Sequence, residues 1–184
     1  MFPLWFYKKI LLPTGSVDLG ALVAEIAADA DFEARSRSRS VQVRQKAAVL
    51  LEGQPDLLHS AIENVVRNGV RHTAAATEVE ITVHKEISGT NEYAVVSVRD
   101  YGPGVPEESL YDIFRPFFRV EDARDRQTGG SGLGLAIAAR AVHLHGGAIS
   151  AANVAGGGLA VTIKLPCKMP LKGKNGALPL VMKP

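Results

Sequence analysis

Residues 58–72 read LHSAIENVVRNGVRH, and their periodicity is the pattern that decides the fold. It predicts an amphipathic helix over residues 56–71, because at 100° per residue one arc holds only apolar side chains, those of Leu58, Ile62, Val65, Val66 and Val70. Asn64, Asn68 and Arg71 project together on the opposite arc. Asparagine has poor helix propensity, so two mid-helix asparagines four residues apart need a reason. An amide oxygen can ligate a hard cation such as Mg²⁺, which takes its other ligands from phosphates and water. This helix alone leaves two solvent-facing amides as an open alternative.

The sequence DYGPGVP, residues 100–106, follows a strand predicted over residues 93–100. An aspartate at the carboxyl end of a strand can accept a hydrogen bond from an exocyclic amine such as that of adenine. The glycines beside it let a ligand approach the backbone. The same residues also make a good turn, and for this motif alone that interpretation stays open.

A third motif, GGSGLGL at residues 129–135, leads into a helix predicted over residues 133–145. Successive glycine amides at a helix N-terminus form an anion-binding nest that suits phosphates. The motif does not match the dinucleotide-binding fingerprint, because a polar segment rather than a strand precedes it, and it lacks the lysine of a P-loop. By itself this glycine spacing is weak support for a phosphate site.

Composition restricts the class of protein. The chain has 184 residues, of which 46% are hydrophobic and 22% charged, as suits one compact domain. A formal net charge of only +2 gives no support to nucleic-acid binding. The single Cys167 cannot form an internal disulfide, and no apolar run approaches the roughly 20 residues that cross a bilayer.

The remaining periodicities predict one mixed α/β domain over residues 17–166, with a leader or upstream remnant at 1–16 and a loose tail at 167–184. Helices are predicted over residues 18–33, 56–71, 107–114 and 133–145. Strands are predicted over residues 41–44, 47–51, 78–86, 93–100, 148–153 and 159–165. Residues 119–131 fit neither period and have the polar, glycine-ended composition of a mobile loop.

The order of these motifs, joined by IFRPFFR at residues 113–119, resembles that of a known family. The catalytic, ATP-binding domain of bacterial sensor histidine kinases has an N box, a first glycine box, an F box, an ATP lid and a second glycine box in this order. The resemblance covers residues 17–166, and residues 121–126 are similar to the lid of Cpx-type sensors. It implies a Bergerat-type two-layer α/β sandwich, in which a mixed sheet of about five strands packs on about three helices below a mobile ATP lid.

The resemblance implies ATP and Mg²⁺ as cofactors and gives each matching residue a role. Asn68 would ligate Mg²⁺ with Asn64 in support, Arg71 would complete the catalytic set, and Asp100 would bind the adenine amino group. Further nucleotide contacts would come from His72, from Arg119 and Arg126, from Gly102, Gly104 and Val105 on the adenine side, from Phe114, and from the hinge residues Gly130, Ser131, Gly132, Leu133, Gly134 and Leu135. A plain core role for two of the phenylalanines at 114, 117 and 118, and a surface ion pair for Arg126, remain alternatives.

Related ATPases of the gyrase, chaperone and mismatch-repair types hydrolyse ATP with a glutamate one turn before the metal-binding asparagine. Asn64 occupies that place, and Glu63 points about 100° away from it. This favours transfer of the phosphoryl group to a protein acceptor. The alternative function is a nucleotide-binding regulatory module without phosphotransfer.

None of the five histidines fits the acceptor of a sensor kinase, so we expect a catalytic fragment that is monomeric. Its partners would be the dimerisation and histidine-phosphotransfer domain of the same kinase and, downstream, a response regulator. The fragment would lie in the cytoplasm and its parent protein in the bacterial inner membrane.

Overall fold

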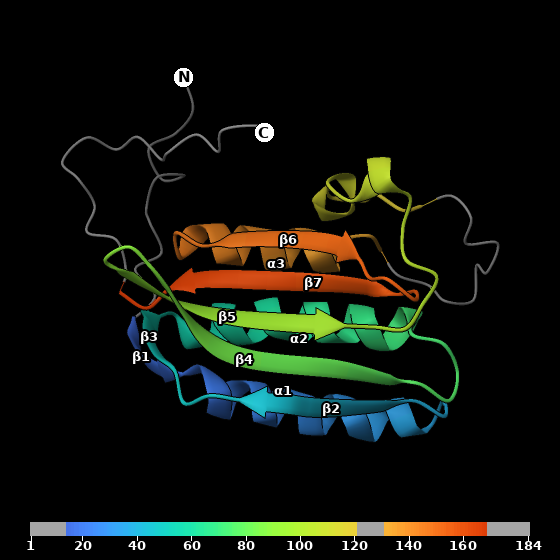
Figure 1. Cartoon of the computed structure of the whole chain (residues 1–184), viewed down its shortest axis with the longest axis horizontal. Helices are drawn as coiled ribbons and strands as arrows, with labels where there is room; N and C mark the ends of the chain where they lie inside the picture. The colour runs from blue at the N-terminus through green and yellow to red at the C-terminus, as the bar shows by residue number, and fades with distance from the viewer. Residues whose placement is uncertain (1–13, 121–130, 169–184) are drawn as a thin grey trace, which may run out of the picture.

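The computed structural model describes residues 14–120 and 131–168, and a mixed five-stranded β-sheet forms its centre (Figure 1). The strand order is β2-β4-β5-β7-β6. The strands are β2 (Ser40–Lys46), β4 (Glu78–Ser88), β5 (Asn91–Arg99), β7 (Leu159–Pro166) and β6 (Ala148–Asn153). Only β2 and β4 pair in parallel, because the chain crosses between them through a helix, whereas every other neighbouring pair is antiparallel.

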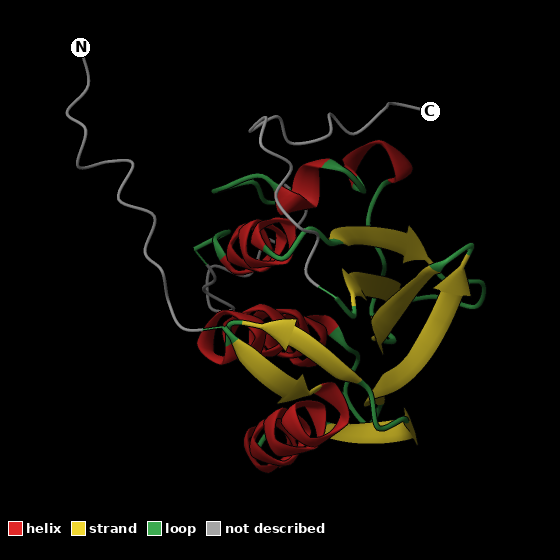
Figure 2. Ribbon diagram, turned by 90° about the vertical axis from the view of Figure 1, so that its left-hand side faces the viewer, coloured by secondary structure: helices red, strands yellow, loops and turns green. Residues whose placement is uncertain are grey.

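Three α-helices cover one face of this sheet as a second layer (Figures 1 and 2). They are α1 (Leu19–Arg35), α2 (Pro55–His72) and α3 (Gly134–Leu144). Side chains alternate between buried and partly exposed along β4 and β7, so every second residue packs against the helices. Each fully buried aliphatic side chain at this interface stabilises the fold by roughly 1.5–3 kcal/mol. The predicted α/β sandwich, with its five strands and three helices, is confirmed.

Helix α2 is held in the middle of the helical layer by its apolar arc. Leu58, Ile62, Val65 and Val66 are almost completely buried. Gly69 allows the close approach, because an added Cβ there would lie 3.2 Å from Val79 Cγ1 on β4. The packing of this arc therefore fixes the direction of the opposite, polar arc.

A second, two-stranded sheet at one end of the molecule pairs β1 (Gly15–Asp18) with β3 (Leu50–Gly53) (Figure 2). The prediction of a strand over residues 47–51 begins too early. The Ala47 N–H donates to Val83 O and Val49 O accepts from the Leu19 N–H, so these residues bond outside the β1–β3 ladder. Strand β1 also includes Gly15 and Ser16, which were predicted to belong to the leader. Their pairing partners lie on β3, which is remote in sequence, so no local pattern indicates this strand.

Two further predictions need correction. Residues 107–114 form two short 3₁₀ turns, η2 (Glu107–Ser109) and η3 (Asp112–Phe114), instead of one helix, since so short a helix is marginal without strong packing. Cys167, predicted to begin the loose tail, is buried, and its backbone bonds to Glu92 O and the Glu52 N–H. The fold thus extends past the predicted boundary at residue 166.

Some predictions fall on residues 1–13, 121–130 and 169–184, which lie outside the described residues. They include most of the predicted lid, with Arg126 and Gly130. Among the helices of residues 14–120 and 131–168, none combines the length and the apolar character needed to cross a membrane.

Candidate functional site

A cavity of about 940 Å³ lies between the polar arc of α2, the loop after β5 and the N-terminus of α3. It brings together most of the predicted site residues, namely Asn64, Asn68, Arg71, His72, Asp100, Gly104, Val105, Arg119, Ser131, Gly132, Gly134 and Leu135. Apart from Arg119, which ends the segment at residues 113–119, these residues come from three motifs that are far apart in the sequence. The prediction that the three motifs form one site is therefore consistent with the geometry.

Asn64 lies at the end of the cavity that faces α3. Its Nδ2 donates to Ser60 O at 2.7 Å, which turns its Oδ1 toward Gly134. A Cβ on residue 134 would lie only 2.9 Å from that Oδ1, so any larger residue there would displace Asn64 or α3. Asn68 and Arg71 follow on the same arc, one and two turns farther along the helix.

Asp100 lies where β5 ends, and its side chain is only 4% exposed. Its Oδ1 accepts hydrogen bonds from the Gly102 N–H at 2.8 Å and from the Leu159 N–H at 3.2 Å. Because these bonds reach the same oxygen, Oδ2 is available to a ligand's amino group. Burial raises the pKa of the Asp100 carboxyl, against the opposing effects of the two amides and of His72 and Arg99.

His72 ends α2 at the same side of the cavity. Burial lowers the pKa of its ring, and the nearby Arg71, Arg39 and Arg119 act in the same direction, whereas Asp100 opposes them. The neutral ring is therefore favoured at neutral pH. An added Cβ on Gly102 would lie 2.4 Å from His72 O, so this glycine lets the loop after Asp100 pass close to the end of α2.

The glycine segment before α3 is joined to the loop at residues 114–118. Gly132 has a φ of +69°, and an added Cβ would lie 2.9 Å from Phe118 O. Its carbonyl accepts a hydrogen bond from the Phe117 N–H at 2.9 Å. This contact joins the glycine segment to the loop at a point where Phe118 and Gly132 both line the cavity.

Three predicted residues are near the cavity without lining it. The Gly102 N–H donates to Asp100 Oδ1, Leu133 is the N-cap residue of α3, and Phe114 packs against the hydrophobic core. Prediction from the sequence missed other residues that line the cavity: Arg67, Pro103, Pro106, Ile113, Phe118, Val120 and Leu159. Most of these lie within or beside the motifs, so their spacing could have indicated them. Leu159 had no such signal, because β5–β7 pairing brings it to Asp100.

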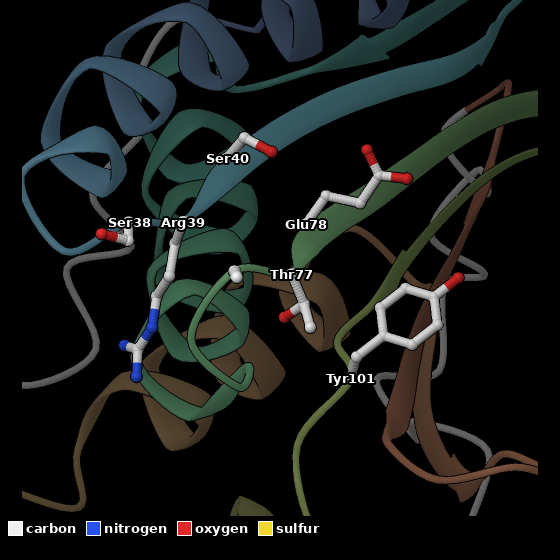
Figure 3. Close-up of a pocket in the computed structure, with 7 residues that line it drawn as sticks. Ser38, Arg39, Ser40, Thr77, Glu78 and Tyr101 are labelled. Atoms are coloured by element: carbon white, nitrogen blue, oxygen red, sulfur yellow. The ribbon is translucent and has the colours of Figure 1, made fainter.

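A second, more open hollow of about 510 Å³ lies beyond the C-terminal end of α2 (Figure 3). Tyr101 and Glu78 lie on one side of it, while Arg39 points away from them. The Arg39 Nη1 donates to the carbonyls of Val70 and Arg71 at 2.7 and 3.0 Å, so this side chain caps the helix. These two bonds stabilise the end of α2 that carries His72.

The donor set favours a metal that binds together with a ligand. Within residues 14–120 and 131–168, no cluster of three or more His, Cys, Asp or Glu side chains could hold a metal ion. Asn64 and Asn68 offer neutral amide oxygens to the cavity. Such donors fit Mg²⁺, which keeps several waters and takes the rest of its ligands from phosphates.

Comparison with known proteins gives consistent matches. The family described as histidine kinase-, DNA gyrase B- and HSP90-like ATPases matches residues 53–169. The sensor histidine kinase CpxA of Escherichia coli K12 is 38% identical over 160 residues, which is 86% of this chain and 34% of CpxA. The chain thus spans about a third of the length of the curated relatives it matches first.

Solved structures show the same arrangement. The mycobacterial sensor histidine kinase MprB is 26% identical, with a TM-score of 0.72 over 84% of this chain and 99% of that one. Full-length ShkA in complex with AMPPNP is 28% identical, with a TM-score of 0.68 over 85% of this chain and 32% of ShkA.

Proposed function

Since this chain belongs to the histidine kinase-, DNA gyrase B- and HSP90-like ATPase family and is an ATP-binding catalytic domain of the sensor histidine kinase type, we propose that it transfers the ATP γ-phosphoryl group to a histidine on another domain. The resemblance found in the sequence motifs is confirmed, including its Cpx-type similarity. The observation that carries the proposal is that Asn68, Arg71 and Asp100 line one cavity.

The cavity can place a nucleotide in one orientation. Asp100 would accept a hydrogen bond from the adenine amino group at the end of β5, and the loop carrying Gly104 and Val105 would form a wall beside the ring. Asn68 and Arg71 would then face the phosphates, toward Gly132 and Gly134 at the start of α3. The amides at this helix N-terminus and the guanidinium favour the negative charge of the phosphates.

Mg²⁺ would be held by Asn68, with Asn64 beside it, and would neutralise charge on the phosphate oxygens. The contribution of this chain is to position the triphosphate and to surround it with donors. Phosphoryl transfer needs chiefly such positioning and charge stabilisation, because the protein has little covalent chemistry to perform.

The direction of the Glu63 side chain supports transfer over hydrolysis. Its carboxylate pairs with Arg67 at 3.4 Å and lies 3.9 Å from His59, and Glu63 is not among the residues that line the described cavity. No carboxylate among the residues that line the described cavity, apart from Asp100 at its adenine end, could activate a water. An attacking group is therefore expected from outside this domain.

A separate domain would supply the acceptor. The His145 side chain is buried, where its Nε2 accepts from the Gln54 N–H at 2.9 Å and its Nδ1 faces Ala141 O at 2.7 Å, so it serves the fold. His72 lies in the cavity itself. We infer that the acceptor lies on the dimerisation and histidine-phosphotransfer domain of the same kinase, and that a response regulator receives the phosphoryl group downstream.

A surface beside the cavity suits that partner domain. On α3, Ile137 and Leu144 are 45% and 51% exposed, and they lie seven residues apart on one helix face. Tyr111 and Phe117, on the neighbouring segment, are also highly exposed. Exposed aromatic and aliphatic side chains of this kind are typical of interaction surfaces. The parent protein would hold the domain on the cytoplasmic side of the inner membrane, where ATP is present.

No feature in the described part of the chain favours the alternative of a regulatory module without transfer, since the residues implied in phosphate and metal binding that can be placed there all reach one region. The chain would act as a monomeric catalytic unit.

The proposal is tested by titrating the chain with ATP in a calorimeter, with and without Mg²⁺, and by adding a purified phosphoacceptor domain of a related sensor kinase with radiolabelled ATP. We expect Mg²⁺-dependent binding and label on the acceptor histidine. Asn68→Ala should remove the Mg²⁺ dependence while the protein stays folded. Binding without any transfer to an acceptor would contradict the kinase function and support the regulatory alternative.

A further inference from the structure

Asn153, the last residue of edge strand β6, is bonded to the loop that forms one wall of the cavity. Its Oδ1 accepts from the Val105 N–H at 3.0 Å, and its Nδ2 donates to Val105 O at 2.7 Å. The same Nδ2 donates to Glu107 Oε1 at 3.0 Å. One side-chain amide thus bonds both backbone groups of Val105, as a neighbouring β-strand would.

The glycine before Val105 is shaped by the same contact. Gly104 has a φ of +73°, and an added Cβ there would lie 2.6 Å from Asn153 Oδ1. Gly104 and Val105 both line the cavity, while Asn153 contacts them from behind. The position of this wall therefore depends on a residue that does not itself line the cavity.

Asn153 is also linked to Asp100 through the sheet. It pairs with Leu159 in the β6–β7 ladder. The Leu159 N–H donates to Asp100 Oδ1, and Leu159 O accepts from the Asp100 N–H at 3.0 Å. The end of β6, the start of β7 and Asp100 thus form one hydrogen-bonded unit behind the adenine end of the cavity.

We propose that Asn153 is a positioning residue of the nucleotide site, which fixes the Gly104–Val105 wall relative to Asp100 and thereby sets the affinity for the adenine ring. The proposal rests on the assignment of this cavity to ATP and adds a determinant of its specificity. Without the amide, the Val105 backbone groups would bond to water and the wall would have to be ordered when the nucleotide binds. Ordering that accompanies binding lowers affinity, whereas a preorganised wall avoids this cost.

The test compares Asn153→Ala with the wild-type chain by calorimetric titration with ATP and GTP in Mg²⁺, together with thermal unfolding of the ligand-free proteins. Loss of the three hydrogen bonds of this exposed side chain predicts an ATP Kd about tenfold higher. The preference for ATP over GTP should fall as well, because the wall and Asp100 together select the base. Asn91→Ala is the matched control, since it makes the same change on an exposed residue at the opposite end of β5 from Asp100.

A merely structural role would lower the unfolding temperature without changing the Kd or the base preference of the folded protein, and that result would overturn the proposal. If Asn153→Ala is unfolded at the titration temperature, Asn153→Asp takes its place. It keeps the Oδ1 acceptor but turns a carboxylate oxygen toward Val105 O and Glu107, so weaker ATP binding is again expected and wild-type affinity would overturn the proposal. Failure of the wild-type chain to bind ATP would instead refute the site assignment itself.

Discussion

Asp100 accepts hydrogen bonds from Gly102 and Leu159 through one oxygen, and burial raises the pKa of its carboxyl. A carboxyl with a raised pKa binds its proton more tightly in the folded state than in the unfolded state. Its contribution to stability is therefore greatest below the ordinary value of 3.8 and is lost as the pH rises through the folded-state pKa. At neutral pH the ionised group therefore contributes less to the stability of the ligand-free protein than the protonated group does at low pH.

Asp100→Asn should therefore separate binding from stability. The amide Oδ1 can still accept from both backbone donors, so the free energy of unfolding at neutral pH should equal or exceed that of the wild type. The amide NH₂ would face the adenine amino group, and loss of a hydrogen bond to a charged acceptor should weaken ATP binding about 10- to 100-fold. Urea unfolding and ATP titration measure the two effects. Asp29→Asn, at an exposed position on α1, is the control. Equal ATP affinity in the two variants would refute the role of Asp100.

His72 gives a pH dependence of the opposite sign. Burial and neighbouring arginines lower its pKa below the ordinary value of 6.5, so the unfolded chain binds a proton more readily than the folded one. Stability should be unaffected by this group above about pH 7 and should fall as the pH drops below about 6.5.

The variant His72→Phe removes this titration. We expect the difference in unfolding free energy between the variant and the wild type, measured without nucleotide, to be constant from pH 8 to 7. Between pH 6.5 and 5.5 it should shift in favour of the variant, because only the wild type must keep this ring neutral in the folded state. A difference that stays constant over the whole range would show that His72 titrates alike in both states.

Among the elements, α3 begins at a residue on which the contact with Asn64 and helix propensity act in opposite directions. Gly134 is its first residue, and an added Cβ would lie 2.9 Å from Asn64 Oδ1. Because Asn64 Nδ2 is already bonded to Ser60 O, the amide cannot move away without losing that bond. Alanine would nevertheless suit the helix better than glycine, by up to about 1 kcal/mol.

Gly134→Ala should therefore change the unfolding temperature little, because the gain in helix propensity offsets the displaced Asn64 contact, while ATP affinity falls about tenfold through displacement of Asn64 or of α3. The measurements are thermal unfolding and ATP titration in Mg²⁺. Gly15→Ala is a matched control, because an added Cβ there meets nothing within 4 Å. If Gly134→Ala binds ATP as tightly as this control, the contact between α2 and α3 does not shape the site.

Prediction of these elements from the sequence succeeded where one element carries its own signal. The arc of Leu58, Ile62 and Val65 predicted α2. The predicted helix over residues 18–33 corresponds to α1, whose first turn is capped by the Asp18 side chain, which accepts from the Ala21 N–H at 3.1 Å. It failed where the structure depends on a remote partner. Strand β1 has only four residues and exists because β3 pairs with it. Residues 107–114 have helical composition, but two tight turns suffice to bury Ile113.

Across the whole molecule, the site is assembled by the sheet. The order β5-β7-β6 brings Leu159 and Asn153 behind Asp100, although they follow it by more than fifty residues. No local pattern could indicate these contacts, because they arise from antiparallel pairing between strands that the chain reaches by way of α3. The motifs therefore predicted the residues that face the ligand better than those that support them.

The proposed partner surface on α3 lies beside the cavity but consists of residues that do not line it in the described part of the chain, which allows binding and transfer to be tested independently. Ile137 is 45% exposed on the helix face away from the core. Ile137→Glu should leave the ATP Kd unchanged, since Ile137 does not line the cavity in the described part of the chain. A charge at an apolar interface should slow phosphoryl transfer to the supplied acceptor domain at least about tenfold.

The control is Ile87→Glu, which makes the same change at a residue that is 70% exposed on β4. This variant should transfer the phosphoryl group at the wild-type rate. Equal transfer by the two variants would place the partner on another face, whereas a loss of ATP binding in Ile137→Glu would mean that α3 had shifted and that the two functions are coupled.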